Sequence, residues 1–320
     1  MILDISPAAP VALGVYISRN EVCVLISDIK SRALYMDKKE LLKESSDSLV
    51  EKIFSLLDSA LSFLKKHSPK NRVLGIGVSS IGPLDPLDGV ILSPAGFFGI
   101  GELPIAGLLT KRYNLPVTVH NDMDASAVAE KLYGNGSLYD SFLYLGITNG
   151  IGSGIIFNRR LYHSGGISGG EIGHMCINFD GPLCNCGNRG CLETYANMPI
   201  ILERMKNATG FSHITPEEFE VLANDPSCDA ILYDMAEKLS VALVNAINLL
   251  DVQAVIIGHE GAHIPLPYLK QMEESINRRI LGAGYRNVPV IRSYFGSRAP
   301  LMGSVALIFE RLFGGDFFEA

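Results

Sequence analysis

The chain contains no tryptophan, no excess of positive charge and no long apolar run. Without tryptophan, the commonest stacking platform for a sugar ring is missing, so a bound carbohydrate would be held mainly by hydrogen bonds. The net charge of −7 argues against a nucleic-acid-binding surface, which would need a basic face. We therefore expect no nucleic acid contact by this chain itself.

Targeting and membrane signals are also missing from the sequence. No apolar run approaches the roughly 20 residues that a transmembrane helix needs, so no membrane contact is expected. The N-terminal segment lacks the basic start of a secretory signal peptide. The chain has six cysteines, and a cluster of three suits reduced thiols better than the disulfides of an exported protein. The expected location is the cytoplasm.

The 320 residues, 48% of them hydrophobic, are enough for two domains with substantial cores. Three short strands are predicted over residues 11–38, and residues 142–162 repeat this hairpin plan. Helices are predicted near 215–224 and 228–250. Because a hairpin-led β/α pattern occurs twice, we expect an α/β fold of two related lobes that face each other across a cleft.

The boundary between the lobes is expected near residue 120. The first lobe would cover residues 1–120, joined by a C-terminal helix within 300–320. The second, larger lobe would cover residues 121–299 and carry the clustered cysteines.

A short segment of the second lobe places one imidazole and three thiols in the spacing H-x9-C-x-C-x4-C. These residues are His174, Cys184, Cys186 and Cys191. They form the ligand set of a closed, structural zinc site, and Gly187 and Gly190 allow the backbone to turn tightly between them. The alternatives are a disulfide with a spare thiol, or simple packing residues. A C-x-C pair makes a poor disulfide, so the pattern favours zinc.

Two carboxylates, Glu171 and Glu193, flank this cluster. They cannot join a metal site that already has four ligands, so they need another role. Carboxylates are good acceptors for vicinal hydroxyl groups. Recognition of a sugar is therefore the function we expect for them.

Five motifs together resemble those of one protein family. They are IGPLDPLDGVILSP (81–94), HNDMDASAVAE (120–130), GIGSGII (150–156), GGEIGHM (169–175) and CNCGNRGCLETYA (184–196). The chain resembles the ROK family of sugar kinases and sugar-responsive transcriptional repressors. The resemblance implies an actin-like, ribonuclease-H-like double lobe, and relatives commonly form homodimers.

The resemblance also implies roles for polar residues. In kinases of the family, the acid of an Asn-Asp pair is the general base, and that pair is Asn121-Asp122 here. Glu171, His174 and Glu193 would bind the sugar ring, so His174 would serve both metal and sugar. The alternative for Asp122 is a helix-capping carboxylate.

Two residues after the first buried strand are weaker candidates. Ser80 and Gly82 would either line the same sugar site or serve as ordinary turn residues.

The nucleotide side departs from the kinase pattern. The second hairpin turn is largely intact, although Asn149 stands where kinases usually have threonine. The candidate nucleotide-binding residues come from this turn and, in one case, from a later glycine run: Thr148, Asn149, Gly150, Gly152 and Gly258. The first turn reads Tyr16-Ile17-Ser18-Arg19-Asn20 where family kinases have Asp-x-Gly-Gly-Thr. In the later glycine run of the kinases, this chain reads Gly258-His259-Glu260-Gly261, with two bulky residues between the glycines. Close approach of backbone amides to phosphates needs small residues, so nucleotide binding is expected to be weak.

We therefore expect a sugar-sensing protein of the transcriptional-regulator type, closest in pattern to the sugar-binding part of the family's repressors. Only ten residues precede the first predicted strand, too few for a helix-turn-helix, so DNA contact would require a further domain. The alternative is an ATP- and Mg²⁺-dependent hexose or N-acetylhexosamine kinase that uses Asp122 as its base.

Overall fold

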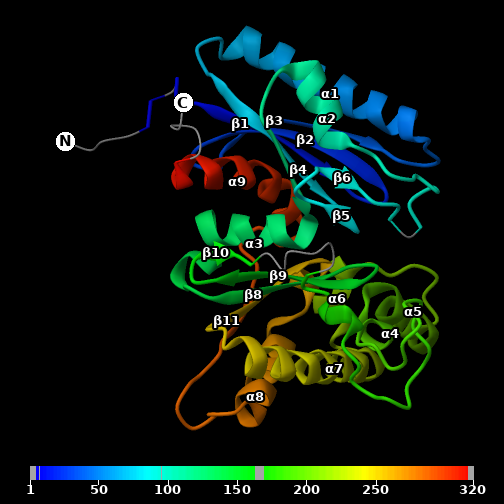
Figure 1. Ribbon diagram of the computed structural model, residues 1–320. Coiled ribbons are helices and arrows are strands. Elements are labelled where there is room, and N and C mark those ends of the chain that lie inside the picture. The colour runs from blue at the N-terminus through cyan, green and yellow to red at the C-terminus, as the bar shows by residue number, and fades with distance from the viewer. Residues whose placement is uncertain (1–4, 7, 95, 163–168, 316–320) are drawn as a thin grey trace. The chain divides into compact units, whose positions relative to one another are not determined.

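The computed structural model of the protein describes residues 5–6, 8–94, 96–162 and 169–315 (Figure 1). The chain divides into two compact units. Unit 1 contains the described residues up to Tyr133 and returns at Ala299 for the last helix. Unit 2 contains Gly134–Tyr162 and Gly169–Arg298.

Unit 1 is built on a five-stranded sheet of order β3-β2-β1-β4-β7. The strands are β1 (Val11–Ile17), β2 (Glu21–Asp28), β3 (Ala33–Glu40), β4 (Val73–Ser80) and β7 (Val117–Asn121). The first three pair in antiparallel fashion, whereas β4 and β7 continue the sheet in parallel to β1. A two-stranded hairpin, β5 (Leu84–Asp85) and β6 (Val90–Ile91), follows β4.

Helices cover both faces of this sheet, with α1 and α2 on one face and α3 and α9 on the other (Figure 1). They are α1 (Ser46–His67), α2 (Ile105–Tyr113), α3 (Asp122–Tyr133) and α9 (Ala299–Gly314). Helix α1 begins where the Ser45 side chain accepts a hydrogen bond from the Ser48 amide, which satisfies an otherwise unpaired donor. Helix α9 lies directly against the sheet, because a Cβ atom on Gly77 would lie only 1.7 Å from the backbone oxygen of Ser304.

Unit 2 repeats the same sheet plan, with the order β10-β9-β8-β11-β12. Its strands are β8 (Phe142–Ile147), β9 (Ile151–Phe157), β10 (Arg160–Leu161), β11 (Ala254–His259) and β12 (Val290–Arg292). Again an antiparallel hairpin leads, and two parallel strands complete the sheet. The predicted repeat of the hairpin plan is therefore confirmed.

The helices of unit 2 are α4 (Glu193–Ala196), α5 (Met198–Thr209), α6 (Phe219–Leu222), α7 (Pro226–Leu250) and α8 (Leu266–Arg279). The predicted helix 228–250 matches α7. The predicted helix 215–224 is wrong as one element, because a 3-10 turn with a Thr215 capping box precedes the single turn of α6. The 3-10 turns are η1 (Asn135–Leu138), η2 (Ile172–His174), η3 (Pro216–Glu218), η4 (Glu260–His263) and η5 (Gly296–Arg298).

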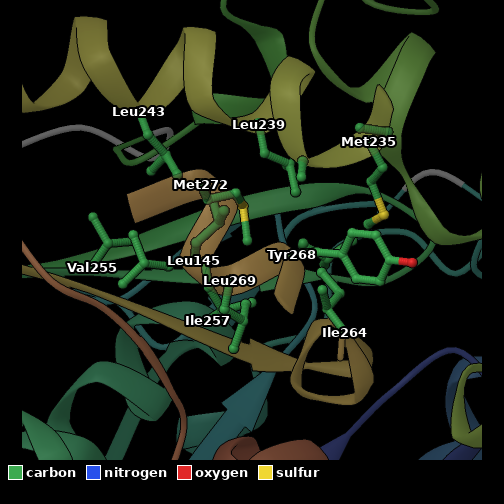
Figure 2. Close-up of a cluster of buried hydrophobic side chains, with 14 of the residues drawn as sticks. Leu145, Met235, Leu239, Leu243, Val255, Ile257, Ile264, Tyr268, Leu269 and Met272 are labelled. Atoms are coloured by element: carbon green, nitrogen blue, oxygen red, sulfur yellow. The ribbon is translucent and has the colours of Figure 1, made fainter. Parts of the chain in front are cut away.

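The core of unit 2 lies between the sheet and the two longest helices (Figure 2). Leu239 and Leu243 of α7 and Met272 of α8 pack with Leu145 and Val255 of the sheet, and all five are buried. Each such side chain contributes about 1.5–3 kcal/mol when it leaves water.

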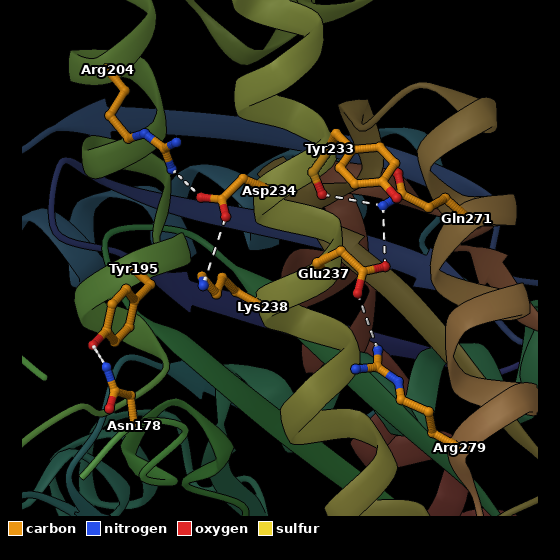
Figure 3. Close-up of polar contacts among 9 residues, drawn as sticks. All are labelled: Asn178, Tyr195, Arg204, Tyr233, Asp234, Glu237, Lys238, Gln271 and Arg279. Carbon is orange, nitrogen blue, oxygen red and sulfur yellow. Dashed lines mark hydrogen bonds and ion pairs between the residues drawn. The ribbon is translucent and has the colours of Figure 1, made fainter. Parts of the chain in front are cut away.

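Polar side chains join the outer part of α7 to its neighbours (Figure 3). Asp234 accepts from Arg204 of α5 at 2.8 Å, and Glu237 accepts from Gln271 of α8 at 3.3 Å. These pairs are partly exposed, so they fix the positions of the helices more than they add to stability.

Candidate metal centre and its polar surroundings

The cysteine-containing loop, residues 175–192, is held by short backbone pairings. Cys176 pairs with Cys191, and Leu183 pairs with Arg189. Gly190 has a φ of +66°, and a Cβ atom there would lie 1.6 Å from the backbone oxygen of Asn178. Only glycine fits this position, as the sequence predicts.

The structure brings the four predicted metal ligands together. The donor atoms of His174, Cys184, Cys186 and Cys191 all lie within 4.8 Å of one another. Nδ1 of His174 is 3.7 Å from Sγ of Cys184, and Sγ of Cys186 is 3.7 Å from Sγ of Cys191. Zinc bonds of about 2.0–2.3 Å in a tetrahedron would place ligand atoms about 3.6–3.8 Å apart. This donor set therefore fits zinc.

The thiols differ in their acidity. Burial raises the pKa of Cys191 to about 12 and also raises the pKa of Cys184. A hydrogen bond with the backbone of Asn188 lowers the pKa of Cys186 to about 7. Zinc, when bound, would hold all three as thiolates and fix the loop, and four protein ligands leave it no open position for catalysis.

Glu193 lies against the same cluster. Its Oε1 is 3.3 Å from Sγ of Cys184 and 3.6 Å from Nδ1 of His174. Its Oε2 would lie 3.4 Å from a Cβ atom on Gly150, in the turn between β8 and β9. The Glu193 side chain is 20% exposed and that of His174 is 35% exposed, so a small ligand can reach both. The sequence does not reveal this link between the metal ligands and the hairpin.

Glu171 stands on a segment that is attached to strand β9. The backbone oxygen of Gly170 accepts two hydrogen bonds from Ser153, one from its amide at 2.9 Å and one from its Oγ at 2.7 Å. The turn η2 follows, in which the His174 amide donates to the backbone oxygen of Glu171. Glu171 is exposed and lies three residues before the predicted metal ligand His174.

In unit 1, the other sugar-site candidates gather at the ends of β4 and β7. Ser80 pairs with Asn121 across the two strands. A Cβ atom on Gly82 would lie 2.9 Å from Nδ2 of Asn121. Asp122 is only 6% exposed and opens α3, where its Oδ1 accepts from the Met123 amide at 3.0 Å. Oδ1 of Asn121 accepts from the same amide at 2.9 Å, so the N-cap contact at this end of α3 comes from Asn121, and Asp122 lies in the first turn.

The first hairpin turn, between β1 and β2, is closed by Ser18. Its Oγ lies within hydrogen-bond distance of two backbone amides, those of Asn20 (3.3 Å) and Glu21 (3.0 Å). The Ser18 amide donates to the backbone oxygen of Glu21. Amides that a phosphate-binding turn would offer to its ligand are therefore used within the turn.

The second hairpin turn, between β8 and β9, has a different arrangement. The Thr148 amide donates to the backbone oxygen of Gly150, and Asn197 donates to that of Asn149. Gly152 lies on β9 opposite Gly146 of β8. The contact between Oγ1 of Thr148 and the Gly150 amide is long, at 3.4 Å.

The remaining nucleotide-site candidate, Gly258, is covered by an aromatic ring. A Cβ atom there would lie 2.0 Å from the hydroxyl oxygen of Tyr144. That hydroxyl is 2.9 Å from Nδ1 of His259, and both side chains are buried. Packing alone accounts for the glycine at this position.

Comparison with known proteins gives a consistent result. The ROK family model matches residues 13–311. The chain is 28% identical to the xylose repressor of Bacillus subtilis, covering 97% of this chain and 80% of that protein. It is 27% identical to the DNA-binding transcriptional repressor Mlc of Escherichia coli, covering 95% and 77%.

Solved structures of the same family share the fold. A ROK family transcriptional regulator, described as a homolog of E. coli Mlc, aligns with a TM-score of 0.86 at 24% identity and covers 96% of this chain and 80% of its own. The ROK hexokinase of Thermus thermophilus aligns with a TM-score of 0.79 at 26% identity, covering 95% and 100%. None of the described helices has the length and apolar character to cross a membrane. The chain belongs to the ROK family and has the α/β, actin-like fold of its members.

Proposed function

We propose that this protein binds a small sugar as a ROK protein of the transcriptional-regulator type and does not phosphorylate it. The curated relatives are named as repressors, for xylose in Bacillus subtilis and for N-acetylglucosamine in E. coli. The family resemblance makes hexoses and N-acetylhexosamines the candidate ligands. The name of the Bacillus subtilis relative adds the pentose xylose.

The sugar-binding part of the proposal depends on the groups beside the metal cluster. Glu193 and His174 are partly exposed, and Glu171 is exposed. Their oxygen and nitrogen atoms can accept and donate hydrogen bonds to neighbouring hydroxyls. Asn121 and Asp122 of unit 1 are proposed as further contacts, with Ser80 and Gly82 beside them. A site built to bind hydroxyls discriminates strongly against analogues that lack them.

Zinc would act on the sugar through the protein. With one ring nitrogen on the metal, the imidazole of His174 is fixed in orientation and tautomer. The Cys184 thiol donates to Oε1 of Glu193 at 3.3 Å, and as a zinc-bound thiolate it would have no proton for this hydrogen bond. Metal binding would therefore orient the sugar-binding side chain of His174 without contacting the sugar itself.

The main observation that supports a regulator over a kinase is the closed first hairpin turn, between β1 and β2. Ser18 uses two amides of the turn, and the Arg19 and Asn20 side chains stand where small residues would be needed. Phosphoryl transfer depends mainly on positioning and charge stabilisation, so a turn that cannot cradle phosphate removes much of the catalysis. Gly258, under the Tyr144 ring, is poorly placed to compensate.

The alternative, an ATP-dependent sugar kinase, is favoured by Asp122. This carboxylate is buried at the first turn of α3, where family kinases carry their general base. The similarity to the Thermus thermophilus hexokinase also supports this reading. In that case Thr148, Asn149, Gly150 and Gly152 would contact ATP and Mg²⁺ would be required.

Calorimetry and a coupled assay separate the two functions. Xylose, glucose, N-acetylglucosamine and N-acetylmannosamine are titrated into the zinc-loaded protein, and ADP release is followed with ATP, Mg²⁺ and each sugar. The expected result is saturable binding of at least one sugar, with no binding of a non-hydrolysable ATP analogue and no ADP release. Turnover that disappears in Asp122→Asn would overturn the regulator reading.

We further propose that the protein is a homodimer in the cytoplasm, where its metal-binding thiols stay reduced. Light scattering of the zinc-loaded protein, with and without sugar, tests the dimer. A monomer at micromolar concentration would contradict it.

A further inference from the structure

Cys176 is a thiol that the proposed function does not use. It lies two residues after the metal ligand His174 and is exposed, whereas the metal ligand Cys191 is buried. The two residues face each other across the antiparallel pairing that closes the cysteine-containing loop.

The hydrogen bonds around this pair define its geometry. They run from the amide of Ile177 to the oxygen of Gly190 (2.8 Å) and from the amide of Leu192 to the oxygen of Met175 (2.9 Å). Because these bonds flank Cys176 and Cys191, the two cysteines form a non-hydrogen-bonded pair. Such pairs have Cα atoms about 4.5 Å apart, with both side chains on the same face. A disulfide spans Cα separations of about 4.4–6.8 Å.

The sulfur of Cys191 has two possible partners. It lies 3.7 Å from Sγ of Cys186 within the metal-ligand set, and rotation about its Cα–Cβ bond would turn it toward Cys176. A sulfur in a disulfide is no longer a thiolate, so Cys191 cannot serve both. A disulfide at this pair would leave the metal with three ligands.

We propose that Cys176 is a redox modification site, and that its oxidation by hydrogen peroxide forms a Cys176–Cys191 disulfide that releases the zinc. The peroxide first oxidises the Cys176 thiol to a sulfenic acid, and one water leaves. The Cys191 thiolate then attacks the sulfenic sulfur, and the hydroxyl group leaves as a second water after taking up a proton. Per disulfide, one peroxide, one thiol, one thiolate and one proton give two waters.

The accessibility of the cysteines favours Cys176 as the first thiol attacked. Cys23 and Cys228 are buried, and burial raises the pKa of both thiols, so they are poor targets. Cys186 is exposed, but in the zinc-loaded protein its sulfur is bound to the metal. The competing product is a disulfide between Cys186 and Cys191, whose sulfurs are also close.

The experiment uses the full, reduced, zinc-loaded chain. Hydrogen peroxide is added in steps, zinc release is followed with a chromogenic chelator, and the disulfide is identified by mass spectrometry. Trypsin cleaves after Arg189, and a second protease that cleaves before Asp180 separates Cys176 from Cys184 and Cys186. The two possible disulfides then give linked peptides of different mass.

The expected result is a Cys176–Cys191 linked peptide that appears in step with zinc release, both reversed by dithiothreitol and added zinc. Cys176→Ser, at an exposed position, should slow zinc release about tenfold or more. Cys23→Ala, in unit 1, should release zinc at the wild-type rate. Zinc release from Cys176→Ser at the wild-type rate, or a linked peptide joining Cys186 to Cys191, would overturn the proposal. Neither readout involves sugar, so the result is independent of the proposed function.

Discussion

The two sheets share a strand order, and in each a pair of glycines faces across the central parallel strands. Gly14 lies opposite Gly77 in unit 1, and Gly146 lies opposite Gly258 in unit 2. The space that these glycines leave is filled differently. In unit 1 the backbone of helix α9 approaches Gly77, whereas in unit 2 the ring of Tyr144 covers Gly258.

The leading hairpins differ in the same way. Ser18 closes the first turn with its own side chain, whereas the second turn lies beside Glu193, which contacts the predicted metal ligands. A repeated sequence pattern therefore determines the strand order but not what packs on it. The two units share the sheet. The groups available to a ligand differ between them, because different turns, helices and loops pack on each sheet.

Metal removal should give the largest difference between the units. With EDTA, we expect the cysteine-containing loop to lose its order, at a cost of more than about 5 kcal/mol in local stability. Hydrogen exchange should then speed up at the amides of Ile177 and Leu192, which bond across the loop, while the sheet of unit 1 keeps its protection. Equal loss of protection in both units would contradict an effect confined to unit 2.

Substitution of the paired glycines should give the next largest effect. In Gly77→Ala the new methyl group meets the Ser304 backbone, which cannot move away, so we expect a loss of about 3 kcal/mol in unfolding free energy. Gly258→Ala meets a side chain, and we expect about 1–2 kcal/mol. Urea unfolding measures both.

Gly101→Ala is the matched control, because a Cβ atom on Gly101 would meet none of the described residues within 4 Å. It should unfold like the wild type. A cost for Gly258→Ala above that for Gly77→Ala would mean that the Tyr144 side chain yields less readily than the backbone of α9.

Loss of one charge beside the second turn should weaken sugar binding without releasing the metal. Glu193→Gln keeps the size of the side chain but removes a charged acceptor, so we expect about 10–100-fold weaker sugar binding by calorimetry. Zinc content should stay at the wild-type level. Glu274→Gln, on the exposed face of α8, is the control and should bind sugar normally. Unchanged affinity in Glu193→Gln would exclude this carboxylate from the sugar site.

The smallest effect is expected at the turns themselves. Ser18→Ala removes the oxygen that contacts two amides and should cost about 1 kcal/mol in thermal or urea unfolding. Thr148→Ala removes a contact at 3.4 Å and should cost less than about 0.5 kcal/mol. A larger loss of unfolding free energy in Thr148→Ala than in Ser18→Ala would show that the second turn depends more on its hydroxyl group than the first turn does.

Much of the fold is predictable because its signals are local. Apolar periodicity locates the helix 228–250, which matches α7 closely, and the repeated hairpin plan in 142–162 matches β8 and β9. The spacing of His174 and the three cysteines gives the metal-ligand set, because the ligands lie within one short segment. The family resemblance rests on the same kind of local motif.

The contacts of the site are not predictable in this way, because they join segments that are distant along the chain. Nothing in the sequence indicates that Glu193 lies beside the turn at Gly150. The pairing of Cys176 with Cys191 depends on the register of two short segments, and a shift of one residue would separate the thiols. Such features follow from tertiary packing, which sequence patterns do not encode residue by residue.

The return of α9 to the first sheet has a consequence for how the protein is made. A ribosome completes residues 1–133 well before it reaches Ala299, so the first sheet waits without the helix that covers Gly14 and Gly77. The described residues of unit 2, Gly134–Tyr162 and Gly169–Arg298, all precede α9 in the chain. The nascent first sheet therefore keeps an apolar face available to chaperones until α9 has been made.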